Sequence, residues 1–175
     1  MESTSEKIPK SSFAEGLDLF EKNAERLFNK AVEAFKRKDF LSAFTLGFTA
    51  CEQLGSALFI LENWDKVSIG KEAWDNFKLH KVKIAHIKAR TEIALLQELG
   101  VLEEGMQIVA DEEYLGKLVS LRTSDSLYVN FDFKNTVWKA PMEFEQNLDG
   151  WAVEVLMQAK HSTRDLHIEK ERKGI

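Results

Sequence analysis

The sequence predicts an all-α fold, a helical bundle of about five helices with one short extended, strand-like segment. Apolar residues recur at intervals of three and four over several long stretches, which is the period of a helix with one buried face. The 175 residues include only two prolines and nine glycines, too few for a turn-rich sandwich or barrel. A content of 44% hydrophobic and 30% charged residues is typical of a globular chain of single-domain size.

We expect a flexible N-terminus over residues 1–12, one helical domain over 13–168 and a loose charged tail over 169–175. Residues 1–12 are polar and lack the apolar stretch of a signal peptide. The single cysteine, Cys51, excludes an internal disulfide framework and a cysteine-based zinc site. The four histidines have no paired spacing. We therefore expect a cytoplasmic protein with no metal and no other cofactor.

The first two helices have clear boundaries in the sequence. Lys36–Lys38 suit the C-terminus of the first helix, and Asp39 can cap a second helix over about 40–62. The small residues of the second helix, Gly47 and Gly55 among them, would let a neighbouring backbone approach closely. The stripe of the first helix is Phe13, Leu17, Phe20, Ala24, Leu27, Ala31 and Phe35.

The second helix raises the question of a membrane span. Residues 41–61 contain one charge, Glu52, and are long enough to cross a bilayer. A carboxylate near the bilayer centre would cost about 2.5–3.5 kcal/mol, and several serines, threonines and a glutamine dilute the apolar character. The other amphipathic helices also need a surface to pack on. We therefore favour a buried central helix and expect no membrane association.

The sequence after residue 62 predicts a loop, three helices and the extended segment. A loop over 63–70 precedes a third helix from about Lys71 to Leu99, and acids favour a fourth helix over about 111–121. Strict alternation over 127–133 indicates an extended segment that ends in a turn at Lys134 and Asn135. Pro141 can start the last helix, whose stripe is Phe144, Leu148, Trp151, Val155, Ala159 and Leu166.

The third helix carries a local excess of positive charge. No acid occurs between Asp75 and Glu92, although the net charge of the chain is −5 and counts against a surface that binds nucleic acid throughout. Such a segment could contact RNA phosphates, or it could be a solvated face balanced by acids from neighbouring helices. Its bases are Lys78, Lys81, Lys83, Lys88 and Arg90, accompanied by His80 and His86.

Four polar residues are candidates for chemistry. Glu52 must be paired or protonated if it is buried, either with a base of another helix or within a functional polar cluster. His80 shares a helix face with Lys83 and is either a boundary residue or a proton-transfer group. Arg122 can hold a phosphate with two hydrogen bonds, and the Tyr128 hydroxyl can orient it or donate a proton.

In their order and spacing, these pieces resemble the AbiV family of bacterial abortive-infection proteins, which belongs with the HEPN-type helical domains. The resemblance covers roughly residues 17–159 and includes His80 and Lys83, similar to a His-x-x-Lys element of the family. The segment Arg122–Phe131 is similar to an arginine followed by Leu-Tyr-Val-Asp, with Asn130 in place of the acid. Residues 52–56 depart from the family, because Glu-Gln-Leu-Gly-Ser lacks its second acid and its lysine. Trp138 and Pro141 match a Trp-x-x-Pro ending.

The resemblance implies defence against phage, with growth or translation arrested in infected cells. Many HEPN relatives are metal-independent RNases with an Arg-x(4–6)-His motif, but here Tyr128 stands near the histidine position after Arg122. Whether the protein is an enzyme stays open. It is either an RNase-like toxin with Glu52, His80, Lys83, Arg122 and Tyr128 in one cleft, or a non-catalytic module that binds protein or RNA.

The expected partners follow from these two hypotheses. They are an RNA or ribosome-associated target, a phage-encoded trigger protein and a second copy of the chain. Helical domains of this kind commonly form pairs, and the second helix with its small residues is a candidate for the homodimer interface.

Overall fold

The structure is a computed structural model that describes residues 6–77, 79–98, 130–132, 137–139 and 148–175. Within these residues the fold is all-α with short strand pairs, which confirms the expected class. The described helices are α1 (Phe13–Lys36), α2 (Phe40–Glu62), α3 (Lys71–Phe77), α4 (His80–Glu98) and α6 (Leu148–Lys173). The described strands are β1 (Lys7–Pro9), β2 (Ser68–Gly70), β3 (Asn130–Asp132) and β4 (Val137–Lys139).

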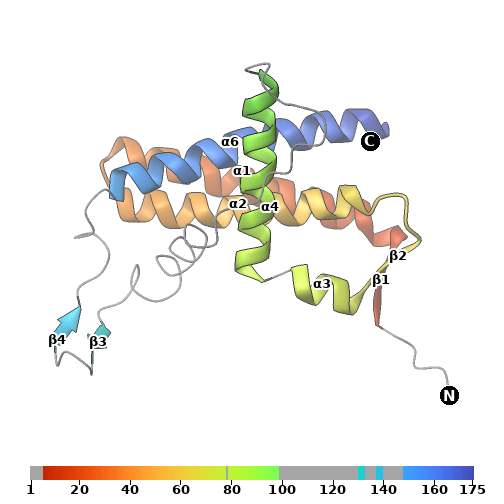
Figure 1. Cartoon of the computed structure of the whole chain (residues 1–175), viewed down its shortest axis with the longest axis horizontal. Coiled ribbons are helices and arrows are strands. Elements are labelled where there is room, and N and C mark those ends of the chain that lie inside the picture. The colour runs from red at the N-terminus through yellow and green to blue at the C-terminus, as the bar shows by residue number, and fades with distance from the viewer. Residues whose placement is uncertain (1–5, 78, 99–129, 133–136, 140–147) are drawn as a thin grey trace.

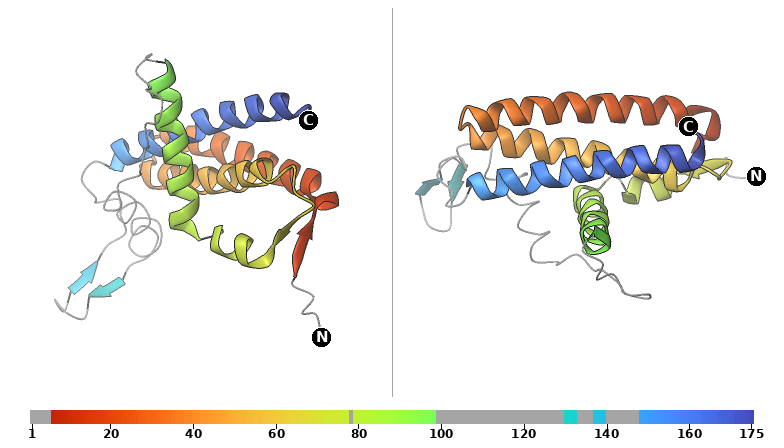
Figure 2. Two further views of the ribbon diagram at one scale, coloured as in Figure 1. Left: turned by 45° about the vertical axis from the view of Figure 1, so that its right-hand side comes forward. Right: turned by 90° about the horizontal axis from the view of Figure 1, so that it is seen from above.

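Helix α2 is the central element of the bundle. It lies between α1 and α6, and α4 crosses these long helices steeply (Figures 1 and 2). By length and composition α2 could cross a membrane, but 72% of its apolar window is buried inside the protein. Its core residues include Phe44, Phe48 and Leu58, all fully buried. This is the burial expected of a core helix, as the sequence predicted.

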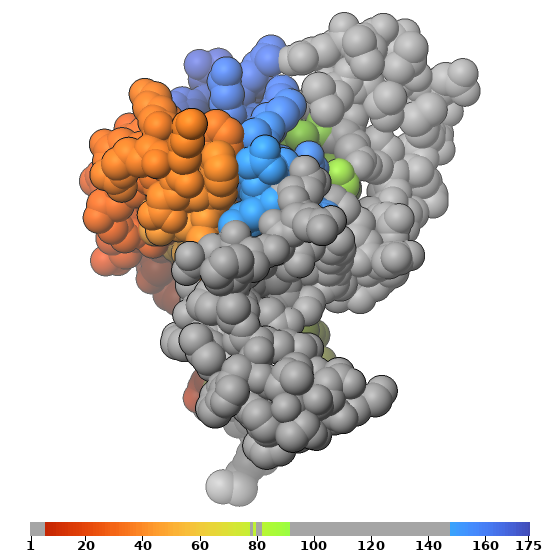
Figure 3. All heavy atoms as spheres, turned by 90° about the vertical axis from the view of Figure 1, so that its left-hand side faces the viewer, coloured from red at the N-terminus to blue at the C-terminus, as the bar shows by residue number. Residues whose placement is uncertain are grey.

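The boundary between α1 and α2 is the predicted one. Helix α1 ends at Lys36, and Lys38 takes a left-handed conformation with φ 62° that reverses the chain. The Asp39 side chain then accepts a hydrogen bond from the backbone N–H of Ser42 at 3.1 Å and caps α2. This turn packs beside the start of α6 at one end of the bundle (Figure 3).

The prediction of a single third helix is wrong in one respect, because the structure divides this segment into α3 and α4. Trp74 and Phe77 of α3 pack on Phe59 near the end of α2, with a stacked Phe59–Phe77 pair at 4.0 Å. Helix α4 instead crosses α2 near Gly55, where Lys83 and Ile87 approach it. One straight helix cannot follow both directions, so the chain bends before His80 (Figure 1).

More regular structure than expected occurs at the N-terminus, after α2 and at the C-terminus. We expected residues 1–12 to be flexible and 63–70 to form a loop, but β1 and β2 pair antiparallel, with Ile8 opposite Ile69. Ile69 is 2% exposed, so burial of its side chain favours this pairing. The tail expected to be loose from residue 169 continues α6 as far as Lys173.

The expected extended segment is described in part. Asn130–Asp132 form β3, which pairs antiparallel with β4, so that Phe131 lies opposite Trp138. The fourth helix over 111–121, the turn at residues 134–135 and a helix start at Pro141 lie outside the described residues. In α6, the predicted core positions Leu148, Val155, Ala159 and Leu166 are buried.

Candidate functional site

The crossing of α2 and α4 places the buried carboxylate of Glu52 beside the largely buried ammonium group of Lys83. Lys83 Nζ lies 3.9 Å from Glu52 Oε1, and the two side chains are 12% and 5% exposed. A methyl group on Gly55 would meet the backbone oxygen of Lys83 at 3.3 Å, so the glycine lets the two backbones approach. Gly55 lies three residues after Glu52 on the same helix, and this close approach brings Lys83 to the carboxylate.

Helix α6 adds a second carboxylate at this crossing. Glu154 Oε1 lies 3.4 Å from Lys88 Nζ of α4 and accepts a hydrogen bond from Gln158 Nε2 at 2.9 Å. The Gln158 side chain is 3% exposed. Sequence reasoning missed Glu154 and Gln158. The available signal was their spacing of four residues on one helix, which places them on the same face.

Cys51 lies next to this cluster, which we call the polar crossing: Glu52, Lys83, Lys88, Glu154 and Gln158. Burial raises the pKa of the Cys51 thiol far above its ordinary value, and the negative charges of Glu52 and Glu154 raise it further. The thiol instead donates a hydrogen bond to the backbone oxygen of Val155 at 3.3 Å. A thiol that stays protonated is neither a nucleophile nor a metal ligand.

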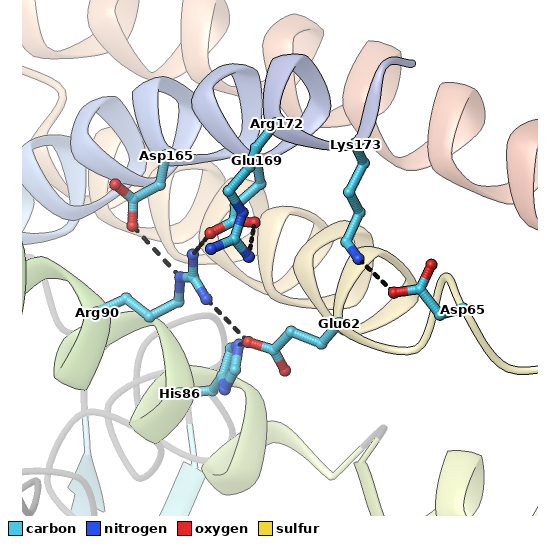
Figure 4. Close-up of polar contacts among 8 residues, drawn as sticks. All are labelled: Glu62, Asp65, His86, Arg90, Asp165, Glu169, Arg172 and Lys173. Atoms are coloured by element: carbon cyan, nitrogen blue, oxygen red, sulfur yellow. Dashed lines mark hydrogen bonds and ion pairs between the residues drawn. The ribbon is translucent and has the colours of Figure 1, made fainter.

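Arg90 forms a second polar cluster, shown in Figure 4. Its guanidinium group lies 2.8 Å from Glu62 of α2, and 3.3 and 3.5 Å from Asp165 and Glu169 of α6. Arg172 also contacts Glu169 at 2.8 Å. One arginine therefore connects α4 to both neighbouring long helices, which the planar, many-donor guanidinium allows.

Glu62 also lies next to His86, whose Nε2 is 3.2 Å from the Glu62 carboxylate without the alignment of a hydrogen bond. Partial burial by itself would raise the pKa of Glu62. The nearby His86 and Arg90 outweigh this effect and lower the pKa from its ordinary value of 4.5. The carboxylate is therefore the favoured form in the folded protein.

The described bases of α4 are held by acids of neighbouring helices. Lys83 pairs with Glu52, Lys88 with Glu154, and Arg90 with three carboxylates. These three side chains are at most 21% exposed. The acids of neighbouring helices therefore balance the charge of these three bases, and a role of the segment in phosphate binding stays a prediction.

Of the five residues expected in one cleft, the structure brings together Glu52 and Lys83. The backbone of His80 begins α4, one turn before Lys83. The side chains of His80 and Lys81, and the whole of Lys78, Arg122 and Tyr128, lie outside what the structure describes. Their place in the site stays a prediction. The described residues contain no group of histidine, cysteine and carboxylate side chains that could hold a metal ion.

The glycines of α2 correct another expectation. A methyl group on Gly47 would lie 2.8 Å from Val155 Cγ2 of α6, and Gly55 faces α4. Both close approaches are therefore made within one chain, and α2 is largely buried there. The small residues of α2 do not provide the surface for a homodimer interface.

The fold and the polar crossing together define a small all-α domain in which charged side chains join three helices. A comparison with protein families finds that the HEPN_AbiV model, described as AbiV, matches residues 12–160. The chain therefore belongs to the AbiV family of HEPN-type proteins, a family associated with abortive infection and phage defence. No curated protein and no solved structure matches the chain.

Proposed function

We propose that this protein is an anti-phage abortive-infection effector that arrests growth or translation of infected cells, and that it acts by binding and not by cutting RNA. Family membership supports the defence role. The observation that carries the binding mode is the buried, paired state of Glu52 and Lys83. An ion pair that is largely buried connects helices, whereas a cation that stabilises a phosphate in a transition state must be open to the substrate.

The other described bases support the same mechanism. Lys88 and Arg90 are 19% and 21% exposed, and each contacts at least one carboxylate. An RNA phosphate would have to displace these acids and leave their charges partly buried without compensation, which is costly. The target would instead be a surface of the translation machinery, with a phage-encoded protein as the trigger.

RNase activity is the second candidate, because the backbone of His80 lies one helical turn from Lys83. In that mechanism His80 would transfer the 2′-hydroxyl proton, Arg122 and Lys83 would stabilise the phosphate charge, Tyr128 would position the phosphate, and Glu52 would orient a cationic side chain. This mechanism requires neither a metal nor another cofactor.

The first experiment tests defence in cells. Bacteria that express the chain and bacteria with an empty vector are infected at high multiplicity, and phage release and cell growth are followed. We expect the expressing cells to stop growing and to release far fewer phage. Normal growth with a normal phage burst would contradict the proposed role.

The second experiment separates binding from cleavage. Purified protein is added to a cell-free translation reaction, and protein synthesis and RNA length are measured together. We expect synthesis to fall while ribosomal, transfer and messenger RNA stay intact. RNA fragments that appear with the wild type and disappear with Arg122→Ala or His80→Ala would replace the binding mechanism by RNase activity.

We further propose that the protein acts in the cytoplasm as a homodimer. The interface would lie outside the core face of α2, because that face is covered by α1, α4 and α6. Light scattering at micromolar concentration is expected to give twice the mass of one 20.0 kDa chain. A monomer at every working concentration would contradict this proposal.

A further inference from the structure

A groove of about 450 Å³ lies between α1 and α6, with Phe28 of α1 and Leu54 of α2 among its lining residues. Both walls rest on α2, which lies between them (Figure 2). The groove is lined by the face of α6 that carries Thr163, whereas Glu154 and Asp165 lie on another face of α6 and contact α4. It is therefore separate from the polar crossing and from the Arg90 cluster.

The two walls of the groove differ in charge. The α1 wall carries Asp18, Glu21 and Glu25 with one base, whereas the α6 wall carries Lys160 and His167. At one end, Glu21 is 2.7 Å from the ammonium group of Lys170, which bridges the two helices there. Towards the other end Glu25 and Lys160 are both exposed, and neither has an ion-pair partner among the described residues.

The length and lining of the groove fit a short helix. Between Glu21, where Lys170 and His167 of α6 contact α1, and Phe28 the α1 wall spans seven residues, which is about 10 Å or nearly two helical turns. Helices α1, α2 and α6 form three sides, so a helix laid between α1 and α6 would pack beside all three. Amphipathic helices commonly bind to proteins in grooves of this kind, with one apolar stripe inward.

We propose that this groove is the docking site for a short amphipathic helix of another protein. Its apolar stripe would contact the half-buried Phe28 above the fully buried Leu54, a basic flank would face Glu25 and an acidic flank would face Lys160. An RNA strand does not fit this pattern, because the acidic α1 wall repels phosphates. The proposal deepens the proposed function, because it identifies the surface on which a protein partner would bind. It rests on that function only in the cellular arm of the test below.

The test uses a labelled synthetic helix of about 14 residues with a leucine stripe, lysine along one flank and glutamate along the other. Two control peptides carry lysine on both flanks or glutamate on both. Fluorescence anisotropy measures their affinity for the full chain. We expect the mixed peptide to bind most tightly, and Glu25→Lys to weaken the mixed peptide while it strengthens the peptide with glutamate on both flanks.

A matched pair of variants locates the binding. Thr163→Trp fills the groove from its α6 wall, whereas Leu19→Trp adds the same ring at an exposed position of α1 outside the lining. Both variants are checked for wild-type helix content and melting temperature. We expect Thr163→Trp to weaken the mixed peptide by at least about tenfold, and Leu19→Trp to leave its affinity unchanged. Equal affinity of both variants, or no preference for the mixed peptide, would overturn the proposal.

Other occupants give distinct results. A wild-type dimer that Thr163→Trp converts to a monomer would assign the groove to a second copy, and an RNA oligonucleotide that displaces the peptide would assign it to RNA; either result overturns the proposal. In the cellular arm, Thr163→Trp should lose phage protection and Leu19→Trp should keep it. If the wild type itself gives no protection, the proposed function fails while the peptide result still decides the groove.

Discussion

The ion pair between Glu52 and Lys83 is the residue-level feature on which the interpretation of the site depends. Glu52 was singled out from the sequence as the one charge in an apolar helix, and a buried carboxylate needs a partner. Two buried charges repay their loss of hydration only with good geometry, and 3.9 Å is a long contact. The pair therefore specifies how α2 and α4 cross more than it stabilises the fold.

This interpretation predicts an asymmetric double-mutant cycle. Lys83→Met leaves the Glu52 carboxylate buried without this partner and should lower the free energy of unfolding by about 3 kcal/mol. The double variant Glu52→Gln with Lys83→Met removes both charges and should recover more than half of that loss. Urea denaturation of the wild type, the two single variants and the double variant measures each value.

The exposed pair between Lys22 and Asp18 provides a matched control, since Lys22 Nζ lies 2.7 Å from the carboxylate but its side chain is 71% exposed. Lys22→Met should cost less than about 1 kcal/mol. If Lys83→Met costs no more than Lys22→Met, the pair at the crossing has no structural role.

The lowered pKa of Glu62 leads to a prediction of how the stability of the protein depends on pH. His86 and Arg90 outweigh burial and lower the pKa of Glu62 in the folded protein below 4.5. A lowered pKa contributes stability above the unfolded pKa, and this contribution is lost as the pH falls through the folded pKa. Glu62→Gln should thus be less stable than the wild type at pH 7 by less than about 1 kcal/mol, because Glu62 is 42% exposed.

Urea midpoints at three pH values test this prediction. The difference between Glu62→Gln and the wild type should be largest above about pH 5, and it should shrink as the pH falls through the lowered pKa of Glu62 in the folded protein. A difference that stays constant over this range would mean that the Glu62 charge does not stabilise the folded state.

At the scale of elements, the sequence predicts what local patterns determine. The bounds of α1 and α2 follow from an amphipathic period and the Asp39 cap, both local signals. The break between α3 and α4 has no such signal, because Phe77 and Ile84 are seven residues apart and keep the helical period across it. Packing on two different parts of α2 decides the break, and a pattern along one helix does not contain that information.

The partners of the α4 bases were unpredictable for the same reason. The sequence showed a basic segment but not that Glu62, Asp165 and Glu169 would meet Arg90 across 28 to 79 residues of chain. Asp165 and Glu169 are four apart and share a helix face, yet many such pairs face only solvent. Only the crossing of α4 over α2 and α6 makes them partners.

The contacts of Arg90 lead to a prediction of the free energy needed to open α4 locally. Arg90→Met removes the contacts to two helices at once and should make local opening of α4 easier by about 1–2 kcal/mol, since the carboxylates are partly exposed. Hydrogen exchange measures this as faster exchange in α4 with little change in α1. Arg90→Lys should restore little, because a single ammonium group cannot reach three carboxylates in that geometry. Full protection of α4 in Arg90→Met would contradict the prediction.

At the scale of the whole molecule, contacts distant in sequence close one end of the bundle, at the connection between α2 and α3. Lys173 Nζ lies 2.9 Å from Asp65 and connects the end of α6 to the segment after α2. On the same segment, the backbone N–H of Lys10 donates to the Val67 oxygen at 3.1 Å, next to the β1–β2 pair. The protein therefore holds the connection between α2 and α3 from its N-terminal and C-terminal ends together.

Removal of the N-terminal strand tests this closure. Deletion of residues 1–9 takes away β1 and uncovers Ile69, which is 2% exposed in the intact chain. Partial exposure of one isoleucine and the loss of three strand residues should lower the free energy of unfolding by about 1–2 kcal/mol. Strand β1 contributes only the partly buried Ile8 to the edge of the core, so the shortened chain should keep its helical circular dichroism and a cooperative transition.

The variant Ile8→Asp separates side-chain burial from strand pairing in that segment. It keeps the backbone of β1 but places a charge opposite Ile69, so it should cost about as much as the deletion if apolar burial dominates. If Ile8→Asp is neutral while the deletion destabilises, the backbone hydrogen bonds hold the strand. If both are neutral, the N-terminal strand does not stabilise the bundle, and the long-range closure of the molecule rests on the contacts of α6 alone.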